Sequence, residues 1–424
     1  MKDLRSTFLD HLKKHLQGPG IPLRIVFWDG HEYAFSPTPL VTMHVHSAKV
    51  LSRMVIGSAL DVLGEAYVEG DIGMEGRYQD LLAVAEAVGD AFSGRKSAAG
   101  KGFLSRWGWA QAHSKARDAD AIRYHYDVSN DFYRLWLDRN LVYSCGYFKT
   151  GGEDIHQAQE QKLDHICRKL HLQPGERLLD IGCGWGGLLS WAARNYGIHG
   201  VGVTLSEEQF TYARERMERE GIADQVEIRL QDYRDIPEEG VFDKVSSVGM
   251  FEHVGRAKLG GYFGAIRRVL KEGGWAMNHG ITAAQQDDQN GHHQGGDFID
   301  KYVFPDGEIP HLWRVVHEMA GQHLEVLDVE NLRPHYAQTL IHWVRRLEEC
   351  KEETIGMVGE KRYRIWAIYM AASAHAFQRN WSTLHQVLVV KQEQLGLTPR
   401  PWERCYQYVD HNSYHEAEVN WGNI

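Results

Sequence analysis

The chain of 424 residues has few cysteines, no paired ones and no long apolar run. Its five cysteines are Cys145, Cys167, Cys183, Cys350 and Cys405. Because none stands in a C-x-x-C pair, neither a zinc site nor a disulfide framework is indicated, and this usage is typical of a reducing compartment. The longest apolar stretch, over 366–377, is interrupted by Ser373 and His375 and is too short to cross a bilayer. Residues 1–17 lack the apolar core of a signal peptide. We therefore expect a cytoplasmic protein without a transmembrane segment.

An overall excess of basic charge is also missing. Lys and Arg number 47 against 57 Asp and Glu, so the net charge is -10 and the protein as a whole repels nucleic acid. Residues 92–117 are the exception, because they contain no acidic residue and interleave Lys and Arg with Phe103, Trp107 and Trp109. This glycine-containing stretch is either a plain solvated linker or one that contacts an anionic membrane surface, where each cation contributes about 1 kcal/mol and indole rings settle at the interface.

The 24 histidines raise the question of a metal site. His292 and His293 are adjacent, so their side chains point apart. His311, His317 and His323 recur every six residues, a spacing that does not stack side chains on one helix face. We therefore expect no metal ion.

The first part of the chain predicts a small α+β domain. Apolar residues recur at helical spacing over 2–16, which indicates a helix that packs on its own domain or lies on a membrane or a partner subunit. Leu23–Phe27 is typical of a strand, Asp29-Gly30 of a hairpin turn, and 82–88 of a helix. We predict an N-terminal α+β domain over 1–91, a basic linker over 92–119 and a catalytic domain over 120–424.

From Leu178 onward, strand-like and helical segments alternate. The strand-like segments are Leu178–Ile181, Gly200–Leu205, Val226–Leu230, Phe242–Val248, Trp275–Ile281, Leu324–Val329 and Leu384–Val390. A long helical stretch over 336–379 interrupts the alternation before the last strand. This order favours an α/β fold in which helices cover both faces of a mainly parallel sheet.

A glycine-rich turn follows the first of these strands. Gly182, Gly184 and Gly186 stand in a G-x-G-x-G pattern, and glycines at such a turn let the backbone approach a ligand closely. The pattern differs from that of a dinucleotide or phosphate loop, so it suits a ligand without a pyrophosphate. Asp180, at the strand end, could hold a cationic amino group of that ligand.

The next two strands also end in polar side chains. In this architecture the end of the second strand lies beside a cofactor ribose, and here it offers Thr204, with Gln209 one turn beyond. Asp232 and Tyr233 follow the third strand and could hold an adenine through a carboxylate and an aromatic face. Ser206 has an alternative role as the N-cap of the following helix.

Several motifs in order resemble one known family. They are Tyr124–Phe132, Tyr143–Phe148, the glycine turn, Thr204–Gln209, Phe251–Gly255 and Tyr302–Gly307. Together they resemble the cyclopropane fatty acid synthase family, which includes the mycolic acid cyclopropane synthases. Gly64–Asp71 resembles part of the lipid-carrier-like domain of its phospholipid-acting members.

The resemblance implies a class I methyltransferase domain with a Rossmann-like seven-stranded sheet and helical insertions. It implies transfer of a methyl group from S-adenosylmethionine to a cis double bond of a phospholipid acyl chain, followed by ring closure with a bound bicarbonate as base. The family's bicarbonate ligands match Cys145, Glu252, His279, the backbone at Ile281, and Tyr336. Its cofactor contacts match Tyr143, Ser144, the Gly182–Gly186 turn, Thr204, Gln209, Asp232 and Tyr233.

Alternatives remain open for the site and the product. Cys145 has a rival interpretation as a covalent nucleophile, although nothing near it in the sequence indicates activation. Close relatives in the family form a methyl or methylene branch instead of a ring, and others methylate small amines. We expect peripheral contact with the inner face of the cell membrane and, from the prevalence of symmetric dimers, a homodimer.

Overall fold

A computed structural model describes residues 4–15, 21–56, 59–78, 80–81, 84, 87, 129–284, 309–392, 400–409 and 421–422. By its internal contacts the chain divides into two compact units. The first comprises Met1–Ala112, Gly295–Pro305 and Val344–His375, and the second His113–Gln294, Asp306–Trp343 and Ala376–Ile424. Residues 344–375 therefore group with the N-terminal part of the chain. The boundaries at 91 and 119 stay a prediction.

The first unit contains a small sheet with helices. Its strands are β1 (Leu23–Phe27), β2 (Glu32–Ala34), β3 (Val41–Val45) and β4 (Ile72–Glu75), in the order β2-β1-β3-β4. Its first helices are α1 (Leu4–His15), α2 (Ala48–Ile56) and α3 (Ala59–Glu69). β1 and β2 form an antiparallel hairpin, and Gly30 takes the positive φ of 80° that the turn needs. The predicted helix, strand and turn in this region are confirmed.

The predicted helical stretch over 336–379 is three helices. They are α13 (Arg333–Glu349), α14 (Lys351–Val358) and α15 (Glu360–Gln378). Gly359, with φ at 81°, separates the last two. Arg364 Nη1 donates to the carbonyl of Tyr67 at 3.0 Å, and Lys361 pairs with Glu69 at 2.9 Å, so the start of α15 packs against α3 within the first unit.

The second unit is built on a seven-stranded sheet in the order β10-β11-β9-β8-β5-β6-β7. Its strands are β5 (Arg177–Ile181), β6 (His199–Thr204), β7 (Val226–Leu230), β8 (Phe242–Val248), β9 (Leu270–Ala283), β10 (Leu324–Asn331) and β11 (Ser382–Lys391). β11 is antiparallel to both of its neighbours, and the pairs among β5 to β9 are parallel. All seven predicted strands form, and the predicted class I methyltransferase sheet is confirmed.

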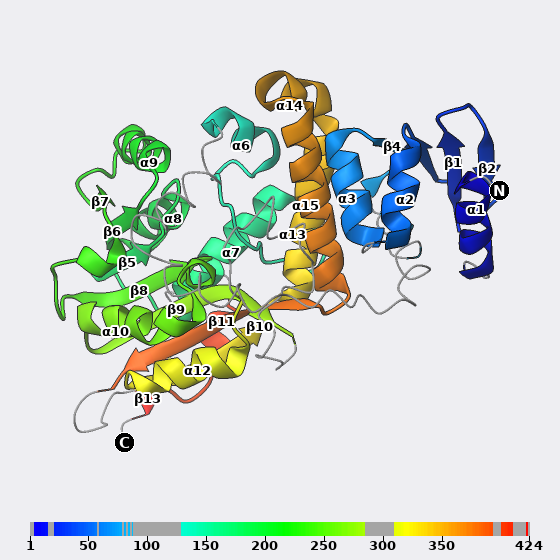
Figure 1. The fold of residues 1–424 in the computed structure, drawn as a ribbon. Helices are drawn as coiled ribbons and strands as arrows, with labels where there is room; N and C mark the ends of the chain where they lie inside the picture. Colours follow the sequence, from blue (N-terminus) through cyan, green and yellow to red (C-terminus); the bar gives the residue numbers. More distant parts are fainter. Residues whose placement is uncertain are drawn as a thin grey trace. The chain divides into compact units, whose positions relative to one another are not determined.

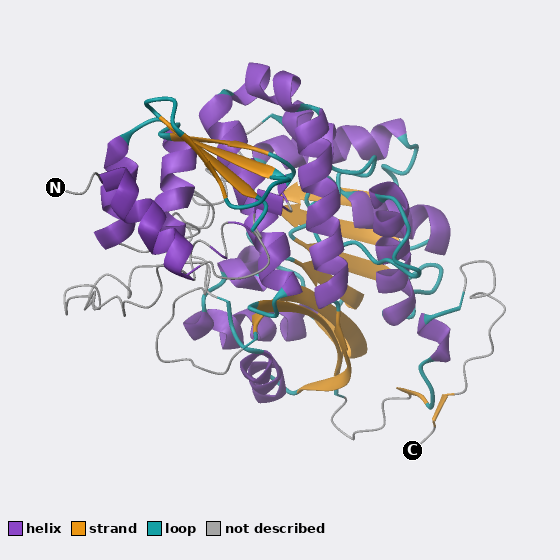
Figure 2. Ribbon diagram, turned by 90° about the vertical axis from the view of Figure 1, so that its right-hand side faces the viewer, coloured by secondary structure: helices purple, strands orange, loops and turns teal. Residues whose placement is uncertain are grey.

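Helices cover both faces of this sheet (Figure 1). One face packs on α7 (Ile155–Lys169), α8 (Gly187–Tyr196) and α9 (Glu207–Arg219), and the other on α10 (Leu259–Val269) and α12 (Leu312–Gly321). Alternation along β5 explains how one strand serves both layers, because Leu178 belongs to the first core cluster and Leu179 to the second. Figure 2 shows the sheet of this unit with its helical layers.

Short elements complete the second unit. They are α6 (Asn130–Trp136), the 3₁₀ turns η3 (Tyr233–Asp235), η4 (Phe251–His253), η5 (Arg256–Lys258) and η6 (Cys405–Gln407), and the paired strands β12 (Arg400–Pro401) and β13 (Trp421–Gly422). Ser129 caps α6, because its side chain accepts a hydrogen bond from the Phe132 amide.

Some predicted features lie outside the described residues. These are most of the helix over 82–88, the basic linker over 92–119, His292 and His293, and the motif over 302–307. Within the described part of the chain, no helix combines the length and apolar character needed to span a membrane.

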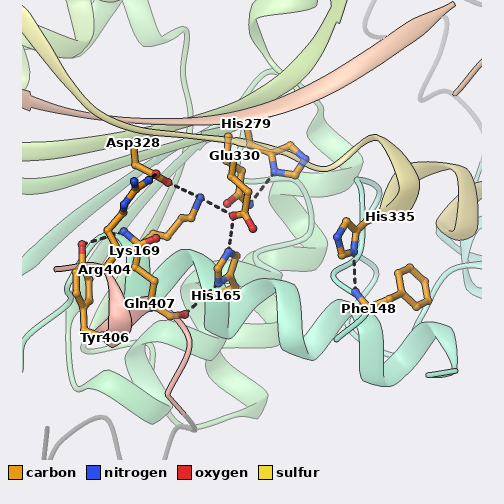
Figure 3. A network of polar contacts seen from close by, with 11 residues as sticks. Phe148, His165, Lys169, His279, Asp328, Glu330, His335, Arg404, Tyr406 and Gln407 are labelled. Carbon is orange, nitrogen blue, oxygen red and sulfur yellow. Dashed lines mark hydrogen bonds and ion pairs between the residues drawn. The ribbon is translucent and has the colours of Figure 1, made fainter. Parts of the chain in front are cut away.

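A buried ionic cluster fixes α7 against β10 in the second unit (Figure 3). Lys169 is fully buried, and its Nζ lies 2.6 Å from a Glu330 carboxylate oxygen and 3.0 Å from an Asp328 one. Glu330 also contacts His165 Nε2 at 2.7 Å. Burial would raise the pKa of Glu330, but the hydrogen bond from His165 and the charge of Lys169 bring that pKa down to about 2. Glu330 is therefore the carboxylate that makes a buried lysine tolerable.

Replacing Glu330 with Gln is expected to cost about 3–5 kcal/mol of stability, because it leaves the Lys169 charge buried with one partner fewer. Since the folded-state pKa is depressed below 4.5, the Glu330 contribution is complete above that pH and is lost as the pH falls from about 4.5 to about 2. Amide exchange of α7 and β10 measures the loss. Glu218→Gln is the control: Glu218 and Arg214 lie 3.9 Å apart and are more than half exposed, so less than about 1 kcal/mol is expected. Equal effects would contradict the prediction.

Candidate active site

A pocket opens where β5, β6 and β8 end and the glycine turn begins. Nine predicted cofactor residues line it: Tyr143, Ser144, Asp180, Gly182, Gly184, Thr204, Gln209, Asp232 and Tyr233. Parallel strands deliver these side chains together, because their carboxyl ends meet at the same edge of the sheet. The sequence therefore located the parts of this pocket although they are spread over some 90 residues.

The glycines of the turn have different roles. Gly182 has φ at 77°, and a Cβ there would lie 2.5 Å from Met250 Cγ, so no other residue fits without movement. Gly186 is the tenth predicted cofactor residue and does not line the pocket. It caps α8 in a left-handed conformation with φ at 76°, and a Cβ would lie 2.8 Å from Met217 Cε. Gly186 thus sets the angle at which α8 leaves the pocket.

The ends of β6 and β7 carry ordered polar side chains. Thr204 Oγ1 donates to Gln209 Oε1 at 2.9 Å, and both line the pocket. Ser206 caps α9, accepting from the Gln209 amide at 3.3 Å, which confirms its alternative role. Asp232 accepts from the Arg234 amide at 2.9 Å and from its guanidinium at 2.6 and 2.8 Å. Any adenine contact of Asp232 must therefore share the carboxylate with Arg234.

Tyr143 and Ser144 reach the pocket on a segment that lies over α7. The Tyr143 ring packs 5.5 Å from Trp136 and 5.3 Å from Trp343, centroid to centroid. Ser144 Oγ accepts a hydrogen bond from Lys162 Nζ at 3.0 Å. Lys162 lines the same pocket and was not predicted. The available signal was its position, since Lys162 falls on the face of α7 that buries Leu163 and Ile166.

Glu252 and His279 are held by backbone and amide contacts at the ends of β8 and β9. Glu252 Oε1 accepts from the Ile281 amide at 2.6 Å, and its Oε2 is buried without a partner. Nδ1 of the buried His279 accepts from Gln386 Nε2 at 3.1 Å, and its Nε2 is buried without a partner. The two residues are linked through β9, because the Ile281 amide that holds Glu252 lies two positions along the strand from His279.

Burial sets the charge state of this pair. It raises the pKa of Glu252 to about 7, although the Ile281 amide opposes the change. Burial also lowers the pKa of His279 well below its usual value, and the charges of Lys162 and Lys169 add to that effect. His279 is therefore neutral at pH 7, and because Nδ1 accepts from Gln386, the proton is on Nε2. The site presents a hydrogen-bond donor and an acceptor with nothing bound to either.

Cys145 and Tyr336 reach the same end of the sheet through Leu332. Cys145 is fully buried, and its Sγ donates to the carbonyls of Gly146 at 3.1 Å and Leu332 at 3.9 Å. The Leu332 carbonyl also accepts from the Tyr336 amide at 3.1 Å, and the Leu332 amide donates to Leu384. Leu384 in turn pairs with Ile281 across β11 and β9. Burial raises the pKa of the Cys145 thiol far above its usual range, so the thiol stays protonated and the nucleophile interpretation is disfavoured.

The Ile281 backbone, which the family resemblance places among the bicarbonate ligands, donates its amide hydrogen to Glu252. Gln386, which orients His279, was not predicted either. Its signal is a polar residue within the apolar run of β11, where it is fully buried. Across the described ranges, no group of three or more His, Cys, Asp or Glu residues is arranged to hold a metal ion.

A family model described as "Mycolic acid cyclopropane synthetase" matches residues 113–387. The chain belongs to this family. It is 44% identical over 401 residues to the "Probable fatty acid methyltransferase" of Pseudomonas putida, with 94% of this chain and 100% of the relative covered. It is 39% identical over 284 residues to the "Cyclopropane-fatty-acyl-phospholipid synthase" of Escherichia coli strain K12, with 67% and 71% covered. A domain of unknown function matches residues 8–97.

Solved structures of this cyclopropane synthetase family share the fold. Mycolic acid cyclopropane synthase CmaA1, complexed with SAH and CTAB, superposes with a TM-score of 0.61 at 30% identity, covering 64% of this chain and 98% of that one. The protein is thus an S-adenosylmethionine-dependent methyltransferase of a family that acts on lipids, and the predicted resemblance is confirmed.

Proposed function

We propose that the enzyme transfers the methyl group of S-adenosylmethionine to a cis double bond of a phospholipid acyl chain and closes a cyclopropane ring, with bound bicarbonate as the base. One observation carries the proposal. Buried Glu252 Oε2 and His279 Nε2 both lack partners, and one is an acceptor while the other is a donor. A buried polar atom without a partner costs free energy, so such a pair suits a small ligand that both accepts and donates hydrogen bonds. Bicarbonate is an anion of that kind.

The chemistry requires a base that cannot itself be methylated. An isolated alkene is a weak nucleophile and attacks a sulfonium methyl only when the two are held together in a dry site. Attack leaves a carbocation, and ring closure removes a proton from the newly added carbon. Bound bicarbonate would supply the base for that proton.

Each side chain has a defined task in holding such an ion. The Nε2–H of His279 and the hydroxyl of Tyr336 donate to its oxygens, and Glu252 accepts from its hydroxyl. The neutral thiol of Cys145 adds a weak donor without adding charge. The backbone at Ile281 is the fifth group of this set, and its amide hydrogen holds Glu252 in place. None of these groups needs to attack the methyl group.

The second candidate is methyl or methylene branching of a fatty acyl chain. The relative from Pseudomonas putida, which matches over its whole length, is named a probable fatty acid methyltransferase, and that name does not specify a ring. The two products share the transfer step and differ in the fate of the carbocation. A methylene branch also forms by loss of a proton, so the bound base serves either product, and the relative named a cyclopropane-fatty-acyl-phospholipid synthase supports ring closure.

Purified enzyme with S-adenosylmethionine, bicarbonate and vesicles of cis-unsaturated phospholipid is expected to give lipid heavier by one CH₂ and without olefinic protons. Mass spectrometry and proton NMR of the extracted lipid measure both. A heavier lipid that keeps vinyl signals would indicate the branching enzyme. Methylation of soluble amines with none on vesicles would indicate a small-molecule N-methyltransferase and would contradict the proposal.

We also propose that the enzyme is cytoplasmic, that it meets the inner face of the membrane peripherally, and that it forms a homodimer. The basic, tryptophan-containing stretch over 92–117 supports the membrane contact. Cosedimentation with anionic vesicles but not with neutral ones is expected, and binding to both alike would contradict it. Light scattering checks the dimer, and a monomer mass at working concentration would contradict it.

A further inference from the structure

We propose that Lys162 binds the carboxylate of the cofactor's methionine moiety while Asp180 binds its amino group, so that the two form a cradle for a zwitterion. This inference rests on the family's use of S-adenosylmethionine and is independent of which lipid product is formed. Lys162 is buried, and its ammonium group is only partly satisfied by hydrogen bonds.

Lys162 lies near the middle of α7 with only 2% of its surface exposed, and it lines the cofactor pocket. Its Nζ donates to Ser144 Oγ at 3.0 Å. Among the described residues, no carboxylate oxygen is recorded within 4.0 Å of this ammonium. Lys169, seven residues or about two helical turns further along α7, differs in having two carboxylates at 2.6 and 3.0 Å. Lys169 is thus neutralised by carboxylates of the protein, whereas the Lys162 ammonium is available to a bound anion.

An ammonium group has three donors, and burying it without an anion is costly. Burial lowers the pKa of Lys162 to about 8, although the charges of Asp138, Cys145 and Asp180 oppose the change. The partner that would restore a full charge is an anion within the pocket. S-adenosylmethionine carries one such group, the carboxylate of its amino acid end.

Asp180 supplies the opposite charge. It follows Leu178 on the same face of β5, which is the face that packs on α7. It is 3% exposed, and burial raises its pKa to about 7 against the opposing effects of Lys162 and Ser246. Both charges are thus poorly stabilised in the same pocket, and a ligand that carries an ammonium and a carboxylate side by side would stabilise both.

The segment that carries Ser144 is held independently of Lys162. Asp138 accepts from the amides of Asn140 and Val142, each at 2.8 Å. Gln159 Nε2 donates to the Ser144 carbonyl at 2.7 Å. Because these contacts already fix the segment, Lys162 is not needed as its tether. Gln159, which does not line the pocket, provides a matched control for a role in positioning only.

Calorimetry with three ligands tests the cradle: S-adenosylhomocysteine, its decarboxylated form, which keeps the amine, and methylthioadenosine, which lacks both groups. Lys162→Met is expected to weaken the binding of S-adenosylhomocysteine about 10- to 100-fold and to leave the affinities for the other two ligands unchanged. Asp180→Asn should weaken the binding of both amine-bearing ligands. Gln159→Met should weaken the binding of all three ligands alike, because it loosens the segment that carries Ser144 without removing a ligand contact.

Two results would overturn the inference. The first is a Lys162→Met variant that binds all three ligands more weakly to the same degree, as a structural role would predict, or that binds them all as tightly as the wild type. The other needs no variant: wild-type enzyme that binds the decarboxylated form as tightly as S-adenosylhomocysteine has no carboxylate site. Because none of these measurements uses lipid or bicarbonate, their failure is distinguishable from failure of the ring-closing proposal.

Discussion

Glu252→Gln is expected to lower product formation by at least about a hundredfold and to leave S-adenosylhomocysteine affinity unchanged. A positioned proton acceptor typically contributes a factor of about 10² to 10⁴. Glutamine keeps the shape and can still accept from Ile281 through its carbonyl, but it places an NH₂ where Glu252 Oε2 now lies buried without a partner. The acceptor for the base's hydroxyl is therefore lost. Turnover on vesicles and calorimetry measure the two quantities, and unchanged turnover at saturating bicarbonate would show that this role is wrong.

The titration of the Glu252 carboxylate should also make the activity depend on pH. Because the pKa of Glu252 is raised to about 7, the group is protonated below that pH and stops accepting. Wild-type activity, measured at a saturating concentration of the cofactor, should therefore fall as the pH decreases through about 7. In Glu252→Gln this limb of the profile should be absent. Below the pKa of Glu252, the ionised fraction and hence the activity should fall about tenfold per pH unit. A wild-type profile that is flat from pH 8 down to 5 would contradict a titrating Glu252.

Gly280→Ala is expected to cost about 1–3 kcal/mol of stability and most of the activity. A Cβ on Gly280 would overlap the ring of Phe251, with Cδ1 2.6 Å and Cζ 2.8 Å away. Phe251 is fully buried in the core on that face of the sheet, so its ring has little room to withdraw. It also precedes Glu252 in η4, and Gly280 stands between His279 and Ile281. The substitution therefore disturbs both halves of the site together.

Gly261→Ala is the matched control for that variant. Gly261 lies in α10, where an added Cβ meets nothing within 4 Å, and alanine there should be neutral or stabilising by up to about 1 kcal/mol. Thermal unfolding and turnover on vesicles compare the two variants. If Gly280→Ala behaves like Gly261→Ala, the packing of η4 against β9 does not position Glu252.

Local patterns in the sequence were sufficient to predict the residues that frame the pocket at the ends of β5, β6 and β8. Leu178–Ile181 is a short apolar run that ends in glycines, and both features act within a few residues of one another. For the same reason the ends of β6 and β7 were identifiable, and Thr204 and Asp232 were found with them. The capping role of Ser206 was predictable because capping depends only on the next helical turn.

The missed residues depend on contacts between distant segments. Lys162 is 18 residues from Ser144 along the chain, and Gln386 is 107 residues from His279. A single sequence does not show which buried surface a polar side chain will contact. The contact of Lys162 with Ser144 and that of Gln386 with His279 could therefore not be predicted. The need for glycine at 280 comes from Phe251, which belongs to another element. The grouping of 344–375 with the N-terminal residues likewise arises from long-range packing.

The most direct test of the account follows the hydrogens of the transferred methyl group. S-adenosylmethionine with a fully deuterated methyl is supplied with cis-unsaturated phospholipid vesicles and bicarbonate, and the product is analysed by mass spectrometry and NMR. The account predicts a saturated ring whose new carbon carries one deuterium fewer than the donor methyl, because a base removes it. A product that keeps every deuterium, or one that loses a deuterium but retains vinyl protons, would contradict ring closure by a base held between Glu252 and His279.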